Sequence, residues 1–282
     1  MTSPTIQVAR HAGVCFGVRR ALEEAYGVLS EQQGSIATLG ELIHNPHVVR
    51  DLERQGVRVA RSVDDVDEGT LIIRAHGVAP QVKNAAESAG LNVIDATCPF
   101  VKRVQDHART LYEEGYQVII VGEAGHPEVE GIFGCTEGKG HIIGSSADLA
   151  SIDISQRVGV VVQTTQTSAN LQQVVDALLL RAREVRVFNT ICSATNERQE
   201  AARALAATCD LMIVIGGRNS GNTRRLAQIC REECPHSYHI EDAQEIDVDW
   251  VADATHIGIT AGASTPQEQI DDVVSTLKQI IS

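Results

Sequence analysis

The feature that most constrains the fold is an internal repeat. When Cys98 is placed on Cys192 and the chain is read forward without a gap, CPFVKRVQDHARTL lies over CSATNERQEAARAL. At the same distance after each cysteine comes an apolar run that ends in glycine, VIIVG at 118–122 and MIVIG at 212–216. Self-similarity at a fixed period indicates that one supersecondary unit has been repeated along the chain.

The first third of the chain follows the same plan. Cys15 is followed by a helical pattern and then by IATLG at 36–40, one residue later than in the other copies. We therefore predict three similar α/β units, at residues 1–97, 98–190 and 191–282. Each unit would supply one cysteine and two polar loops.

The secondary-structure pattern predicts parallel sheets. Short apolar runs alternate with helical patterns, which is typical of βαβ units whose sheets are covered by helices on both faces. Aromatic residues make up only 3% of the chain, so the core must be aliphatic. The predicted strands are Ile36–Leu39, Leu71–Arg74, Asn92–Asp95, Gln117–Val121, Val158–Val162, Leu211–Ile215 and His256–Thr260.

Composition argues against several kinds of partner. The net charge is −13 and the chain has no basic run, so we expect no nucleic-acid partner. No apolar run approaches the roughly 20 residues that span a bilayer, and the first residues lack the apolar region of a signal peptide. We therefore expect no membrane partner and a cytoplasmic location.

Polar side chains follow the predicted strands in each unit. In a parallel α/β unit these loops form the ligand crevice, and helix N-termini there offer free N–H groups to an anion. The residues after the glycine-terminated strands are His44, His126, Ser220 and Asn222. The second polar loop of each unit carries His76, then Thr164 and Thr165, and finally Ser264.

The three repeat cysteines suggest a metal centre. If the units surround a pseudo-threefold axis, Cys15, Cys98 and Cys192 converge, and three thiolates together need a cation or a cluster. Structural zinc usually draws on local Cys-x-x-Cys pairs, and the chain has none. Three thiolates on a four-iron cluster would leave one iron without a protein ligand. The remaining thiols, at 135, 209, 230 and 234, are expected to be free, and the first three of these to pack in the core.

Three functions remain open at this point. The first is a cluster-dependent enzyme, which the family resemblance given below implies to be a reductase that removes a hydroxyl group. The second is a zinc hydrolase that uses the three cysteines and a water molecule activated beside Glu128. The third is a non-catalytic, cluster-bearing sensor or electron carrier that binds an anion, which the same resemblance implies to be a diphosphate.

The chain resembles the LytB-type 4-hydroxy-3-methylbut-2-enyl diphosphate reductase family over essentially its whole length. The motifs that carry the resemblance are HAGVCFGV at 11–18, ELIHNPHVV at 41–49, RAHGV at 74–78, DATCPFV at 95–101, GHPEVEG at 125–131, QTT at 163–165, ICSATNERQ at 191–199, GGRNSGNTRRL at 216–226 and TAGAS at 260–264. The chain departs from the family at Gly221, where a second serine is common, so one hydroxyl contact would be lost there.

The resemblance implies three α/β units in a trefoil around one 4Fe-4S cluster, bound by Cys15, Cys98 and Cys192 with one iron open to substrate. It implies reduction of the substrate to isopentenyl and dimethylallyl diphosphate, the last step of the non-mevalonate isoprenoid pathway, with electrons from ferredoxin or flavodoxin. Glu128 would be the proton source and Thr164 would position the hydroxyl group. The implied substrate-binding residues are His44, His76, His126, Ser220, Asn222 and Ser264.

Overall fold

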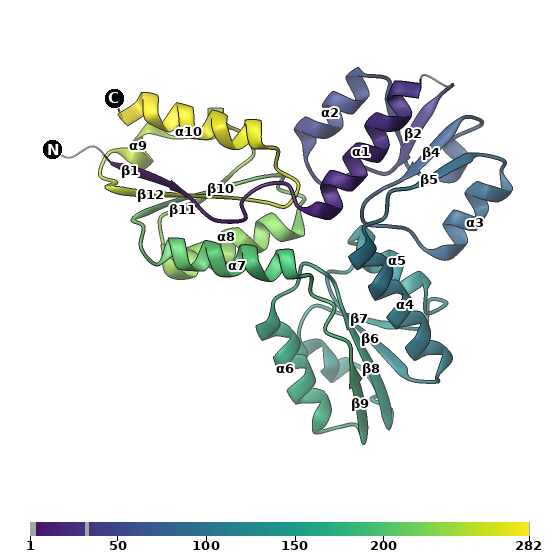
Figure 1. Cartoon of the computed structure of the whole chain (residues 1–282). Coiled ribbons are helices and arrows are strands. Elements are labelled where there is room, and N and C mark those ends of the chain that lie inside the picture. Colours follow the sequence, from purple (N-terminus) through teal and green to yellow (C-terminus); the bar gives the residue numbers. More distant parts are fainter. Residues whose placement is uncertain (1–3, 32–33, 282) are drawn as a thin grey trace. The chain divides into compact units, whose positions relative to one another are not determined.

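The computed structural model describes residues 4–31 and 34–281. Residues 1–3 and 32–33 of the predicted unit 1–97, and the last residue of the unit 191–282, therefore lie outside the described residues. The described chain contains three four-stranded sheets in which every strand pairing is parallel. Helices cover the sheets, as Figure 1 shows.

The three sheets share one strand order. One sheet has the order β3-β2-β4-β5, the next β7-β6-β8-β9, and the third, read in the same direction, β11-β10-β12-β1. The strands of the first two sheets are β2 (Ile36–Leu39), β3 (Val57–Ala60), β4 (Thr70–Ile73), β5 (Asn92–Asp95), β6 (Gln117–Val121), β7 (His141–Ile143), β8 (Arg157–Val162) and β9 (Glu184–Val187). Those of the third are β1 (Thr5–Val8), β10 (Leu211–Ile215), β11 (Ser237–Ile240) and β12 (His256–Ala261).

The longer helices follow strands and start where the sequence provides a start signal. Proline is the first residue of α2, α3, α4 and α5, a position that needs no backbone N–H. The helices are α1 (Phe16–Glu31), α2 (Pro46–Arg54), α3 (Pro80–Ser88), α4 (Pro99–Glu113), α5 (Pro127–Gly134), α6 (Ser168–Leu179), α7 (Ser193–Ala206), α8 (Gly221–Glu233), α9 (Val248–Val251) and α10 (Gln267–Ile281). Short 3-10 turns lie at 63–65, 146–151 and 243–245. None of the described helices is long and apolar enough to cross a membrane.

Aliphatic side chains form the cores on both faces of the sheets. In the third sheet, α7 and α8 pack on one face with Met212 and Val214, while α10 packs on the other face with Ile213 and Ile259. In the second sheet, α4 and α5 cover one face and α6 covers the other. The aliphatic core predicted from the scarcity of aromatic residues is therefore confirmed.

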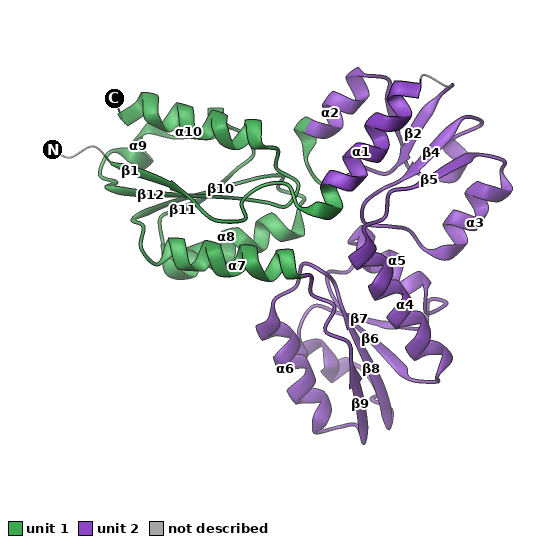
Figure 2. Cartoon of the chain, in the orientation of Figure 1, with its two compact units in different colours: residues 1–18, 44–47, 193–282 green, residues 19–43, 48–192 purple. Residues whose placement is uncertain are grey.

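The chain divides into two compact units, coloured separately in Figure 2. Unit 1 comprises residues 1–18, 44–47 and 193–282, and it contains the third sheet. Unit 2 comprises residues 19–43 and 48–192, and it contains the first two sheets.

The predicted fold class, α/β with three similar units built on parallel sheets, is confirmed. Every central strand of the three sheets was predicted, but the edge strands β1, β3, β7, β9 and β11 were missed. Edge strands have a less continuous apolar pattern because they are covered less completely. The strand β1, for example, has no fully buried residue.

One strand lies in a different sheet from its predicted unit. We placed residues 5–8 in the unit 1–97, but β1 pairs with β12 from Thr5 to Val8 and so completes the third sheet. Each repeat cysteine therefore follows an edge strand of one sheet: Cys15 follows β1, Cys98 follows β5 and Cys192 follows β9. The other predicted boundaries stay a prediction.

Candidate active site

The three repeat cysteines occupy one structural position. Each stands directly before the first residue of a helix, α1, α4 or α7, and each is half-buried. Each backbone amide donates to the carbonyl two residues after a central strand. These hydrogen bonds run from Cys15 N to Ala263 O (3.1 Å), from Cys98 N to Ala75 O (3.0 Å) and from Cys192 N to Thr164 O (3.1 Å). The free N–H groups and dipole at a helix start stabilise a thiolate, so these positions suit metal ligands.

The other four cysteines belong to the apolar core. Cys135 packs beside α4 and α5, while Cys230 and Cys234 pack with Met212 and with the partly buried Cys209. Burial raises the pKa of the Cys230 thiol to about 12. The prediction that Cys135, Cys209 and Cys230 pack in the core is confirmed, with Cys209 only partly buried, and Cys234 packs with Cys230.

Arg20 fixes the loop that leads into Cys98. Its guanidinium donates from Nη1 to Thr97 O (2.9 Å) and from Nη2 to Asp95 O (3.3 Å). The Asp95 carboxylate accepts from Thr97 N (3.1 Å) and lies 2.9 Å from Lys102 Nζ. Burial alone would raise the pKa of Asp95, but the hydrogen bonds from Thr97 and Lys102 lower it to about 2.

Arg198 has the corresponding role in the loop before Cys15. It lies in α7, its residue is only 3% exposed, and it donates from Nη2 to Gly13 O (2.7 Å) and from Nη1 to Ala194 O (2.9 Å). A buried charge is costly unless hydrogen bonds compensate for it, so these contacts hold α7 and the loop in one geometry.

Glu128 is a buried acid held by Thr164. It lies in the first turn of α5 and is 1% exposed. Its Oε1 accepts from Thr164 N (2.6 Å), and its Oε2 accepts from Thr164 Oγ1 (2.8 Å). Burial raises the pKa of Glu128 to about 7, although the two hydrogen bonds from Thr164 act to lower it. A carboxyl group with such a pKa can hold a proton at neutral pH and release it.

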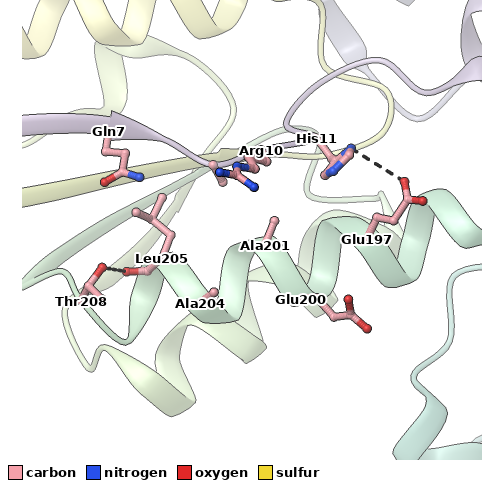
Figure 3. Close-up of a pocket in the computed structure, with 10 residues that line it drawn as sticks. Gln7, Arg10, His11, Glu197, Glu200, Ala201, Ala204, Leu205 and Thr208 are labelled. Atoms are coloured by element: carbon pink, nitrogen blue, oxygen red, sulfur yellow. Dashed lines mark hydrogen bonds and ion pairs between the residues drawn. The ribbon is translucent and has the colours of Figure 1, made fainter.

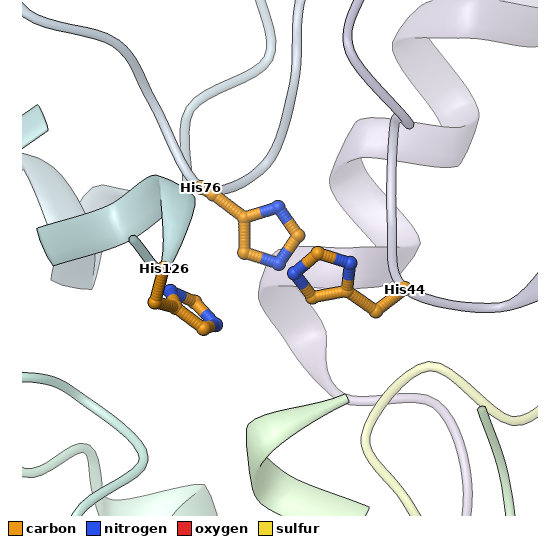
Figure 4. A group of neighbouring side chains, drawn as sticks. All are labelled: His44, His76 and His126. Atoms are coloured by element: carbon orange, nitrogen blue, oxygen red, sulfur yellow. The ribbon is translucent and has the colours of Figure 1, made fainter. Parts of the chain in front are cut away.

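His126 caps the helix that carries Glu128. Its Nδ1 accepts from Glu128 N (3.1 Å), which leaves Nε2 as the protonated nitrogen of the neutral ring. The rings of His126 and His76 meet edge to face with their centroids 5.5 Å apart. Figure 4 shows these two side chains, together with His44 of unit 1.

Ser220 and Asn222 begin α8 in unit 1. Ser220 is the N-cap, and its Oγ accepts from Thr223 N (3.3 Å). Asn222 is 4% exposed, and neither its Nδ2 nor its Oδ1 has a hydrogen-bond partner among the described residues. Buried amide groups without partners are rare in proteins, so Asn222 fits a ligand contact.

The loop around His44 is tied to the loop after β12. Ser264 Oγ donates to His44 O (2.9 Å), and Asn45 Nδ2 donates to Ser264 O (2.9 Å) and to Gln269 Oε1 (3.0 Å). The repeat alignment placed His44 at a helix start, but α2 begins at Pro46, so Asn45 occupies that position. Five residues separate Gly40 from Pro46, whereas four separate Gly122 from Pro127, and this longer loop explains the difference.

The predicted site residues fall into two groups. Unit 1 contains Cys15, His44, Ser220, Asn222 and Ser264, and unit 2 contains Cys98, Cys192, His76, His126, Glu128 and Thr164. Thr164 connects two other members of its group, because its carbonyl accepts from Cys192 while its amide and hydroxyl donate to Glu128.

Sequence reasoning missed Arg20 and Arg198, the residues that hold the cysteine loops. Their only signal was that each lies in the helix that begins directly after a repeat cysteine, α1 for Arg20 and α7 for Arg198.

The sequence model of one family, described as LytB protein, matches residues 6–278. The chain belongs to the LytB protein family. Among the relatives of this chain is the 4-hydroxy-3-methylbut-2-enyl diphosphate reductase of Geobacter sulfurreducens, 48% identical over 97% of both chains. That of Trichlorobacter lovleyi is also 48% identical, again over 97% of each.

Solved structures resemble this chain over nearly its whole length. One is a structure of (E)-4-hydroxy-3-methyl-but-2-enyl diphosphate reductase, described as the terminal enzyme of the non-mevalonate pathway. It is 44% identical, with a TM-score of 0.71, and the match covers 99% of this chain and 100% of that one. Another, E-1-hydroxy-2-methyl-but-2-enyl-4-diphosphate reductase from Plasmodium falciparum, is 27% identical, with a TM-score of 0.93 and coverage of 97% and 88%.

Membership of the LytB family implies an iron–sulfur enzyme, and the donor set of the chain fits one. Three half-buried thiols stand at three equivalent helix starts, where a thiolate is stabilised, while Cys135, Cys230 and Cys234 are buried in the core.

Proposed function

We propose that this chain is a 4-hydroxy-3-methylbut-2-enyl diphosphate reductase. The reaction adds two electrons and two protons to the substrate. The allylic C–O bond breaks, the hydroxyl group leaves as water with one proton, and the carbon skeleton takes the other as a new C–H bond. Protonation at alternative carbons gives isopentenyl or dimethylallyl diphosphate.

The observation that carries the proposal is the position of Thr164. Its carbonyl oxygen accepts from the amide of Cys192, and its own amide and hydroxyl donate to the two oxygens of Glu128. One residue therefore connects a thiol suited to a redox centre with an acid whose pKa is about 7. Removal of a hydroxyl group as water needs both electrons and an acid within reach.

Cys15, Cys98 and Cys192 are the residues that would hold the cluster. When bound, a 4Fe-4S cluster with three thiolate ligands supplies electrons one at a time and an open iron that acts as a Lewis acid. The helix starts at the three thiols would help to offset the negative charge of such a cluster.

Glu128 would give its proton to the departing hydroxyl group. Thr164 Oγ1, which contacts Glu128 Oε2 at 2.8 Å, would orient that hydroxyl group by a second hydrogen bond. The neutral His126 ring, with Nδ1 engaged by the helix amide, would contact the substrate through its Nε2 proton.

The diphosphate would be bound by His44, His76, Ser220, Asn222 and Ser264. These are histidines, hydroxyls and an amide, without lysine or arginine. Helix starts can supply the positive potential that a diphosphate requires, as at Ser220 and Asn222 in the first turn of α8.

Ferredoxin or flavodoxin would supply the electrons, and we propose that the enzyme acts in the cytoplasm. The net charge of −13 does not prevent diphosphate binding, because local groups determine the potential inside a site.

Two measurements on anaerobically purified protein test this proposal. The first is analysis of iron, sulfide and zinc, and the second is a turnover assay. We expect iron and acid-labile sulfide, and oxidation of reduced viologen when the hydroxylated C5 diphosphate is added. Zinc in place of iron after reconstitution would favour the hydrolase. Iron without turnover would favour a sensor or an electron carrier.

A further inference from the structure

Three short segments of unit 1 carry side chains of the proposed diphosphate site. They are residues 44–47, the segment 216–222 after β10 and the loop 262–265 after β12. Glycine at 217 lets the first two segments approach, because a Cβ atom there would lie 2.8 Å from His44 O. Since the three segments are far apart in the sequence, contacts between them must hold them together.

Asn45 is the buried side chain at which two of these segments meet. Its Nδ2 donates to Ser264 O (2.9 Å) and to Gln269 Oε1 (3.0 Å), and the residue is fully buried. Its Oδ1 accepts from His47 N (3.0 Å), which is the bond that an N-cap residue makes with the first turn of its helix, here α2. Both ends of the amide are therefore engaged, and rotating it by half a turn would point its oxygen at two acceptors.

Gln269 extends these contacts to the third segment. Its Nε2 donates to Glu241 O, in the loop after β11, while the Glu241 carboxylate accepts from Arg218 N (2.7 Å). Arg218 lies two residues before Ser220, in the loop that leads into α8. A chain of hydrogen bonds therefore runs from Asn45 through Gln269 and Glu241 to the loop that begins α8.

Asn45 can act on a ligand through its neighbours. Both protons of its Nδ2 are used within the protein, and Ser264 in turn donates from Oγ to His44 O (2.9 Å). The N-caps of α5 and α8, His126 and Ser220, are by contrast proposed to contact the substrate themselves. In the first repeat the longer loop leaves that contact to His44, and the N-cap Asn45 fixes the loop that carries it.

We propose that Asn45, together with Gln269, is a positioning residue for the diphosphate-binding segments of unit 1. The inference rests on the proposed reductase function and adds to it two groups that act without touching the substrate. Loops that are already ordered lose less freedom when an anion binds, so the network strengthens binding. Glu128 and Thr164, proposed to act on the hydroxyl group, belong to unit 2, so loss of the network should change KM more than kcat.

The variants separate positioning from helix capping. Serine caps helices about as well as asparagine does, but its single hydroxyl cannot donate two hydrogen bonds, so Asn45→Ser keeps the cap and loses the network. Gln269→Ala breaks the network at its second residue and serves if Asn45→Ser does not fold. Gln267→Ala is the matched control, because Gln267 is exposed on the same helix and donates to Asp271 Oδ1 (2.9 Å).

A second place in unit 1 where an anion could bind needs its own control. Arg10 and His11 line a hollow of about 630 Å³ between β1 and α7, which Figure 3 shows. His11 Nδ1 lies 3.7 Å from Glu197 Oε2, and both side chains are about half exposed. Arg10→Gln removes the arginine charge from this hollow and leaves the hydrogen bonds of Asn45 unchanged.

Turnover and binding are both measured on reconstituted, anaerobic protein. The first measurement gives KM and kcat with reduced viologen, and the second gives the Kd of inorganic diphosphate by titration calorimetry. We expect Asn45→Ser and Gln269→Ala to raise KM and Kd about tenfold, with kcat and iron content unchanged. Gln267→Ala and Arg10→Gln should match the wild type in all four quantities.

Three results would overturn the proposal. The first is an unchanged KM and Kd in both network variants. The second is a fall in kcat and iron content by the same factor as KM rises, which marks a purely structural role. The third is weaker diphosphate binding in Arg10→Gln but not in the network variants, which would place the anion in the hollow. Absence of viologen turnover in the wild type would instead count against the reductase function, and the Kd values would still test Asn45.

Discussion

Glu128 provides the most informative perturbation, because burial raises its pKa from 4.5 to about 7. If the protonated acid is the active form, the rate should fall as pH rises through 7. About nine tenths of the groups are protonated at pH 6 and about one tenth at pH 8, so kcat should fall about tenfold between these values. Glu128→Gln should lower kcat by roughly 10²–10⁴.

The same shift predicts the sign of a change in stability. The folded state binds the Glu128 proton more tightly than the unfolded state does. Proton binding at Glu128 therefore adds to the free energy of unfolding in full below pH 4.5, and this stabilisation is lost as pH rises through about 7. The loss amounts to about 3 kcal/mol at most. Glu128→Gln is isosteric with the protonated acid, so its thermal midpoint should vary less between pH 6 and pH 8 than that of the wild type.

The assay is oxidation of reduced viologen by the reconstituted enzyme from pH 6 to pH 9, with iron content measured in each sample. Glu130→Gln is the matched control, because Glu130 lies on the same helix but is exposed and accepts from Gly125 N (3.0 Å). A wild-type rate in Glu128→Gln with full iron content would refute the assignment of the proton donor. A kcat that does not change between pH 6 and pH 8 would contradict the raised pKa of Glu128 as the basis of this assignment.

Three further outcomes are expected. Arg198→Gln should lower the free energy of unfolding by about 1–3 kcal/mol and reduce iron retention. Arg203→Gln, on the exposed face of α7, should change neither quantity. Denaturant unfolding and iron analysis of both variants measure the two effects. Equal iron retention in both would exclude the positioning role. Asn222→Ala should raise the KM for the diphosphate about tenfold with a smaller effect on kcat, and steady-state kinetics showing an unchanged KM would remove Asn222 from the site. Cys98→Ser should reduce iron content much more than Cys135→Ser, and equal iron content in the two would contradict the choice of ligands.

Much of the fold could be predicted because the repeat and the buried central strands leave a continuous apolar pattern. The strands β6 and β10 are almost wholly buried, and both were predicted from such runs. The edge strand β1 has no such pattern, and its pairing with β12 depends on contacts across nearly the whole chain. Local sequence contains no information on such a pairing.

The site shows the same distinction between local and distant information. The repeat identified His126 and Ser220 as equivalent, and both are N-caps of helices, at α5 and α8. Arg20 and Arg198 donate to the carbonyl groups of Thr97 and Gly13, which are 77 and 185 residues away in the sequence. The sequence does not show that these groups are close in space. Nor does sequence predict that Thr164 contacts both Cys192 and Glu128, because that contact requires three separate segments to fold together.

The central claim is that this chain performs a two-electron removal of a hydroxyl group at a cluster held by three repeat cysteines. The most direct test measures reduced viologen consumed and products formed from the hydroxylated C5 diphosphate, using anaerobic protein of known iron content. We predict two viologen electrons per molecule of isopentenyl or dimethylallyl diphosphate, at a rate proportional to iron content. Turnover that is independent of iron, or release of phosphate without consumption of viologen, would contradict the account.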